Sequence, residues 1–139
     1  MREEDLKNRV TRTRFSSFDC DETVEDIDFA VKAQDGSYLL WAEAKQKPTD
    51  TSVMLTQLVL TIGKPRTFDD KLPPPFLGCF DSKKIAFVPD SNIQPIFYQT
   101  DFSYRVASSD AETREFMHVN KQVQSILDSS DQQYLFDLI

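Results

Sequence analysis

A chain of 139 residues is long enough to bury one hydrophobic core and too short for two, so we expect a single domain over residues 1–139. Hydrophobic residues make up 40% of the chain and only three Gly occur, which excludes a disordered or low-complexity chain. The formal net charge of −7 counts against a stand-alone nucleic-acid binder, because phosphate affinity comes mainly from a surplus of Lys and Arg.

The first part of the chain predicts a helix followed by antiparallel strands. Sparse apolar positions recur with helical spacing over residues 2–14, and residues 15–20 have the composition of a first strand. Apolar and polar residues then alternate over 27–32, as in a strand with one buried face. Residues 34–37 include Asp-Gly, which favours a hairpin turn, so the next strand, 38–45, should run antiparallel.

The second half predicts a helix between strands. Thr51 or Ser52 can cap a helix whose apolar residues recur at three and four, and Gly63-Lys64-Pro65 should end it. Further predicted elements are strands over 76–80 and 85–88 and helices over 92–98 and 119–127. The order is α-β-β-β-α-β followed by smaller elements, which indicates an α/β fold with a mixed sheet flanked by helices.

The chemically informative residues are Asp28 on one strand and the triplet Glu43-Ala44-Lys45 at the end of the next. The side-chain period of two places Glu43 and Lys45 on one face and turns Ala44 toward the core. Pairing across the hairpin can bring Asp28 close to Glu43, and two carboxylates so close repel unless a cation or proton intervenes.

Oxygen donors of this kind suit Mg²⁺, for which Mn²⁺ can substitute. We expect Asp28, Glu43 and the backbone carbonyl of Ala44 to be the metal ligands. Lys45 would orient the attacking water, act as a general base, or neutralise charge that develops on a phosphate.

These residues resemble a known family. The run Asp28 to Lys45, with fourteen residues between Asp28 and Glu43, resembles the motif of the PD-(D/E)XK nuclease superfamily, although Ile27 stands where the Pro of that name would be. The α-β-β-β-α-β order is also the core of that superfamily. Longer phrases are similar to the amino-terminal nuclease region of type IIG restriction-modification enzymes: residues 27–29, 40–45, 57–64 and 72–78.

The resemblance implies a Mg²⁺-dependent endonuclease that cuts double-stranded DNA. It also implies that the chain is an amino-terminal fragment, or a separated subunit, of a longer restriction-modification polypeptide. The remainder would hold an S-adenosylmethionine-dependent methyltransferase and a target-recognition domain. Cutting both strands usually needs two such sites, so we expect dimerisation or transient pairing. Two more site residues follow from the resemblance: Gln57, and a glutamate on the first helix, either Glu4 or its neighbour Glu3.

Several less specific interpretations remain open. An Asp followed by Glu-x-Lys can also be a solvated strand end with a surface ion pair, and a nuclease-like fold can act as a catalytically silent interaction or DNA-docking module. The acidic run over residues 19–26 is typical of a solvated loop, although it can supply a second metal ligand. His118, the single histidine, is expected at the surface.

Compartment is predicted from what the sequence lacks. No run approaches the roughly 20 apolar residues of a membrane span, and the first residues have no secretory-signal pattern, so we expect a cytoplasmic protein without a membrane partner. Cys20 and Cys79 are too few for a disulfide framework or a zinc knuckle and should be reduced, buried thiols.

Overall fold

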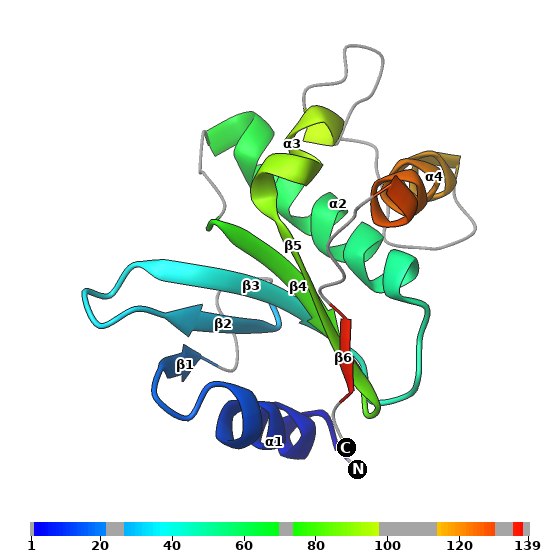
Figure 1. The fold of residues 1–139 in the computed structure, drawn as a ribbon. Coiled ribbons are helices and arrows are strands. Elements are labelled where there is room, and N and C mark those ends of the chain that lie inside the picture. Colours follow the sequence, from blue (N-terminus) through cyan, green and yellow to red (C-terminus); the bar gives the residue numbers. More distant parts are fainter. Residues whose placement is uncertain (1, 22–26, 70–73, 98–113, 130–134, 138–139) are drawn as a thin grey trace.

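The computed structural model describes residues 2–21, 27–69, 74–97, 114–129 and 135–137 (Figure 1). Its helices are α1 (Glu3–Arg14), α2 (Thr51–Asp69), α3 (Asp90–Phe97) and α4 (Arg114–Ser129). Its strands are β1 (Asp19–Asp21), β2 (Phe29–Lys32), β3 (Tyr38–Ala44), β4 (Phe76–Phe80), β5 (Lys84–Pro89) and β6 (Leu135–Asp137). No helix among these described residues is long and apolar enough to cross a membrane.

The strands form one six-stranded sheet in the order β1-β2-β3-β4-β5-β6. Strands β3 and β4 pair in parallel, joined by the crossover helix α2, and the other neighbours pair antiparallel. The predicted α/β class with a mixed sheet is therefore confirmed, and the chain begins with the predicted order α-β-β-β-α-β.

Helices cover both faces of this sheet, as Figure 1 shows. On one face α1 buries Leu6 and Val10 in a cluster that includes Phe29 and Phe80. On the other face α2, α3 and α4 bury a second cluster around Leu77 of β4. The sheet thus separates two hydrophobic layers, and each central strand must be apolar on both sides.

Strand β3 lies in the interior of the sheet and carries the acidic end of the motif. Leu40, Ala42 and Ala44 belong to the cluster on the α1 face, whereas Trp41 packs against the cluster on the α2 face. Because side chains alternate along a strand, Glu43 lies on the α2 face of β3, one residue before the strand ends.

The hairpin that joins β2 to β3 turns where the sequence predicts it. Gly36 has a φ of 86°, a conformation that glycine adopts without a steric penalty, and the Gly36 N–H donates to the carbonyl of Ala33. Strand β2 begins only at Phe29, so Asp28 lies at its start and not within it.

Two sequence predictions about elements are corrected, and one strand was missed. Residues 15–18 form a turn instead of strand, since the Phe18 N–H donates to the Phe15 carbonyl at 3.0 Å. Helix α2 does not end at Gly63 but continues through Pro65 to Asp69. Buried residues between Met54 and Ile62 already fix this helix in the core, so their packing outweighs the local stop signal of Gly63 and Pro65. Strand β6 was not predicted, because three residues are too short to show a period.

Both cysteines are free among the described residues, Cys79 fully buried and Cys20 half-buried. Burial raises the pKa of the Cys79 thiol, which keeps it protonated and unreactive. His118 is exposed, as expected.

Candidate active site

Asp28 and Glu43 face each other across the β2–β3 pair. The antiparallel register aligns Phe29 with Ala42, and Asp28 directly precedes Phe29 while Glu43 directly follows Ala42. The Asp28 and Glu43 carboxyl groups lie close enough to interact by charge and by a hydrogen bond. The Ala44 N–H donates to Oδ2 of Asp28 at 3.1 Å, which fixes the Asp28 carboxylate at the end of β3. The two carboxylates that the sequence predicts to converge therefore do so.

Lys45 stands beside Glu43, as the period of two predicts. Its Nζ lies 3.3 Å from Oε1 of Glu43, while Ala44 between them is only 3% exposed and packs in the α1-side core. The Lys45 N–H donates to the Phe80 carbonyl at 3.0 Å, so the residue beyond β3 is still held against the end of β4. Backbone bonds thus position the Lys45 ammonium, whose side chain remains 36% exposed.

The surroundings of the Glu43 carboxyl disfavour its charged form. Burial first, and then the negative charge of Asp28, raise the pKa of Glu43 from 4.5 to about 7, although Lys45 acts in the opposite direction. A hydrogen bond between the Glu43 and Asp28 carboxyl groups contributes to the same rise. The pair therefore holds a proton near neutral pH unless another positive charge replaces it.

A surface cleft of about 480 Å³ opens over these groups. Its lining residues come from α1, from the start of β2, and from the end of β3 with the loop that follows: Glu3, Asp28, Glu43, Ala44, Lys45, Gln46, Lys47 and Thr49. Most of these residues are polar, which suits a charged substrate better than an apolar ligand.

Not every predicted site residue lies at this cleft. Of the two glutamates that the resemblance left open, Glu3 lines the cleft and Glu4 is exposed outside it. Gln57 is half-buried on α2 and does not line the cleft, and its Oε1 is buried with no hydrogen-bond partner among the described residues. Most of the acidic run, residues 22–26, lies outside the described residues.

Sequence reasoning missed the loop that follows β3. Lys47 and Thr49 line the cleft, and the only sequence signal for them is their place directly after the Glu-Ala-Lys triplet. The predicted strand ends at Lys45, and no role was predicted for the residues that follow it.

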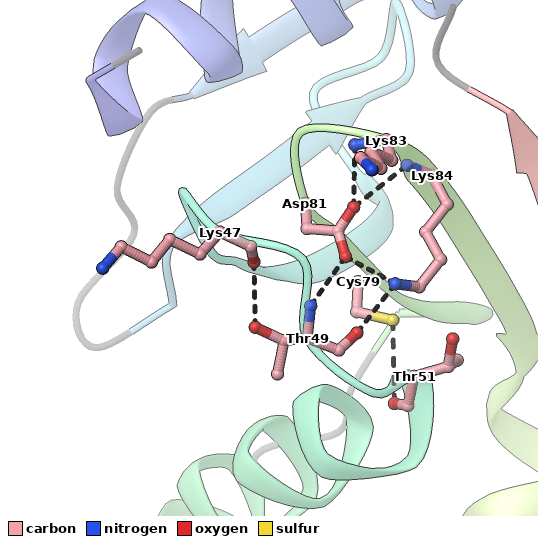
Figure 2. A network of polar contacts seen from close by, with 7 residues as sticks. All are labelled: Lys47, Thr49, Thr51, Cys79, Asp81, Lys83 and Lys84. Atoms are coloured by element: carbon pink, nitrogen blue, oxygen red, sulfur yellow. Dashed lines mark hydrogen bonds and ion pairs between the residues drawn. The ribbon is translucent and has the colours of Figure 1, made fainter.

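A buried carboxylate supports this loop from below (Figure 2). Asp81, which is 0% exposed, accepts hydrogen bonds from the backbone N–H groups of Thr49, Lys83 and Lys84 at 2.8 to 3.0 Å. The Lys84 ammonium pairs with the same carboxylate and donates to the Thr49 carbonyl at 2.8 Å. The local sequence gives only a turn signal here, because Asp commonly accepts hydrogen bonds from N–H groups two and three residues later.

These bonds decide the charge state of Asp81. Burial by itself would raise the pKa of Asp81, but the bonds from Lys84 and from the backbone N–H groups outweigh it and lower that pKa. Asp81 is therefore ionised and fully paired at neutral pH.

The donor set of the cleft fits a hard divalent cation. Asp28 and Glu43 present carboxylate oxygens from one side, and Ala44 lines the same cleft with its backbone. Among the residues that the structure describes, no three His, Cys, Asp or Glu side chains form a metal-binding group. Two carboxylates and retained waters are nevertheless a usual set for Mg²⁺, whereas Zn²⁺ prefers Cys and His.

Comparisons with known proteins add no neighbour to this description. No family model, no curated protein and no solved structure matches the chain. The chemistry of the cleft must therefore be argued from its own geometry.

Proposed function

We propose that this chain is a Mg²⁺-dependent endodeoxyribonuclease domain that hydrolyses phosphodiester bonds of double-stranded DNA. The observation that carries the proposal is the juxtaposition of Asp28 with Glu43 at the end of β3, with the Lys45 ammonium 3.3 Å from Glu43 in the same cleft. This is the arrangement that the PD-(D/E)XK motif requires.

Each group has a role in the proposal. Asp28, Glu43 and the Ala44 carbonyl would hold the cation, and the Ala44 N–H keeps the Asp28 carboxylate turned toward it. When bound, Mg²⁺ supplies a Lewis acid for the phosphate and lowers the pKa of a coordinated water. Lys45 places a compact positive charge where it can orient the attacking water or neutralise the phosphate.

Other parts of the proposal rest on the acidic charge and on the resemblance to type IIG restriction-modification enzymes. A domain with a net charge of −7 is poorly suited to read base edges, so specificity would come from elsewhere. We place the domain in a restriction-modification polypeptide whose methyltransferase, which uses S-adenosylmethionine, and target-recognition domain bind the DNA sequence. Pairing of two nuclease domains would then cut both strands.

Calorimetry with Mg²⁺ and Mn²⁺ tests the metal site. We expect binding by the wild-type chain and none by the double variant Asp28→Asn, Glu43→Gln. The matched control is Glu115→Gln with Asp128→Asn on α4, which makes the same change of charge away from the cleft. Equal binding by the cleft variant and the wild type would contradict the carboxylate pair as ligands.

A catalytically silent docking module is the second candidate. It is favoured by the presence of only two converging carboxylates within the described residues, and by the net charge. Cleavage of plasmid DNA in Mg²⁺ separates the two candidates, because a silent module would give intact DNA at every concentration of a chain that still binds the cation.

A further inference from the structure

The loop after β3 is closed at both ends by the end of a single strand. The Lys45 N–H donates to the Phe80 carbonyl at 3.0 Å, and the Thr49 N–H donates to Oδ2 of Asp81 at 3.0 Å. The Lys84 ammonium bonds the Thr49 carbonyl at 2.8 Å and pairs with Asp81. Residues 45–49 thus leave and rejoin the sheet at two consecutive residues of the chain.

Lys47 lies at the centre of this closed loop. The Thr49 hydroxyl donates to its carbonyl at 2.9 Å, which shapes the turn, and Figure 2 shows the Lys47 side chain extending away from Asp81. Lys47 is exposed and lines the cleft, and no ion pair within the described part of the chain involves its ammonium. Among the described residues, its ammonium is therefore an unpaired positive charge in the lining of the cleft that holds the carboxylate pair.

The buried Asp81–Lys84 pair is better explained by its role in positioning the loop than by a contribution to the stability of the fold. Removing two charges from water costs about as much as their attraction returns, so apolar residues would stabilise the fold equally well. What the Asp81–Lys84 pair provides is the position of the loop. Two bonds hold the backbone of Thr49, one to Asp81 and one from Lys84, and three further bonds from Lys83 and Lys84 hold the Asp81 carboxylate in place.

We propose that Lys47 binds a phosphate of the DNA backbone beside the candidate active site, and that Asp81 and Lys84 are positioning residues that hold its loop. This inference rests on the proposed nuclease function and names one substrate contact of that site. A chain with a net charge of −7 repels DNA overall, so it needs local cations at the phosphates that it approaches. Among the described residues that line the cleft, Lys45 is paired with Glu43, whereas Lys47 has no ion pair.

The test is the salt dependence of binding to a short fluorescent DNA duplex in Mg²⁺, followed by anisotropy. Each phosphate contact contributes about 0.9 to the slope of log affinity against log salt. We expect Lys47→Gln to lower the slope by about 1 and to weaken binding about threefold to tenfold, with Lys47→Arg restoring the slope. Lys121→Gln on α4 removes the same charge from an exposed position away from the cleft and should leave slope and affinity unchanged.

Positioning is tested with Asp81→Asn and Thr49→Ala. Thr49→Ala removes the hydroxyl that shapes the turn without leaving a buried charge unpaired, so it stays informative where Asp81→Asn fails to fold. Both should lower the slope by part of the Lys47→Gln effect in a chain with unchanged circular dichroism. A purely structural role would alter the melting temperature and leave the slope of the folded chain intact.

The outcomes separate this inference from the proposed function. DNA cleavage that depends on Asp28 and Glu43, together with an unchanged slope in Lys47→Gln, overturns the phosphate contact and leaves the nuclease proposal standing. A slope that depends on Lys47 in a chain that never cuts DNA supports the contact and overturns the nuclease. Absence of any DNA binding by the wild type overturns both.

Discussion

Two carboxylates end neighbouring parallel strands of this protein and have opposite electrostatic surroundings. Asp81, directly after β4, is fully buried and has the Lys84 ammonium and three backbone N–H groups as donors. Glu43, next to last in β3, is 9% exposed and has Lys45 on one side and the negative Asp28 on the other. The pKa of Asp81 is lowered, whereas that of Glu43 is raised to about 7.

The difference shows which buried charge is complete without a ligand. Asp81 has enough donors to remain ionised, so nothing needs to be added and its effect is on structure. Glu43 with Asp28 lacks positive charge, so the pair favours any proton or cation that enters the cleft. This contrast distinguishes a structural carboxylate, Asp81, from a candidate metal ligand, Glu43, although both lie at the ends of neighbouring strands.

The largest expected effect is the loss of DNA cleavage when a residue of the candidate active site is replaced. Replacing Asp28 by Asn, Glu43 by Gln or Lys45 by Met should each lower the cleavage rate by on the order of a thousandfold, since each removes a ligand or the cationic group. Plasmid nicking in Mg²⁺ measures the rate, and circular dichroism checks that the fold is intact. Two variants that still cut at the wild-type rate would show that the site is misassigned.

Replacing Asp81, whose charge is fully paired, should lower the stability of the protein. Asp81→Asn leaves Lys84 without its charged partner, and we expect the free energy of unfolding to fall by about 2–4 kcal/mol. Because the pKa of Asp81 in the folded chain is lowered, its contribution to stability is present above the ordinary aspartate pKa of 3.8 and is lost as the pH falls below that value. Urea unfolding at pH 7 and pH 3 measures both effects; an equal loss at the two pH values would contradict this assignment.

The contribution of Glu43 to stability should show the opposite pH dependence. Glu43 binds its proton more tightly in the folded chain, so without metal its contribution is full below pH 4.5 and falls as the pH rises to about 7. Glu43→Gln should remove this decline. Urea unfolding of both proteins in a metal chelator between pH 4 and pH 8 measures it, and Asp81→Asn serves as the control that keeps the decline.

The affinity for a cation should also depend on pH, because Glu43 must lose its proton before it can bind metal. A ligand must be deprotonated to bind metal, so Mn²⁺ affinity should rise about tenfold per pH unit up to about pH 7 and then level off. Calorimetry in two buffers with different ionisation enthalpies counts the released proton. Affinity that does not change between pH 5.5 and pH 8 would show that Glu43 is not a ligand.

Local patterns explain why much of this contrast was predictable and part of it was not. Alternation placed Glu43 and Lys45 on one face, and the Asp-Gly turn predicted the hairpin that brings Asp28 close to Glu43. The support from Asp81 joins residues 32 positions apart, and no period of the sequence encodes such a bond. The end of α2 was misjudged for a related reason, since packing of its first twelve residues outweighs the local signal of Gly63 and Pro65.

The smallest expected effect distinguishes the two glutamates of α1. Glu3 lines the cleft, but its Oε1 lies 3.9 Å from the Lys7 ammonium, so this carboxylate is already partly neutralised. We therefore expect Glu3→Gln to lower Mn²⁺ affinity and cleavage by only about threefold, as for a charge that acts through space across a hydrated cleft.

Glu4→Gln is the matched control, because it makes the same change one residue away on the exposed side of α1 and should change neither quantity. A larger loss in Glu4→Gln than in Glu3→Gln would mean that α1 turns its other side to the site when DNA or metal is bound. Equal and negligible losses would restrict the cation site to the end of β3, where Asp28, Glu43 and the Ala44 carbonyl would have to bind the cation with water alone.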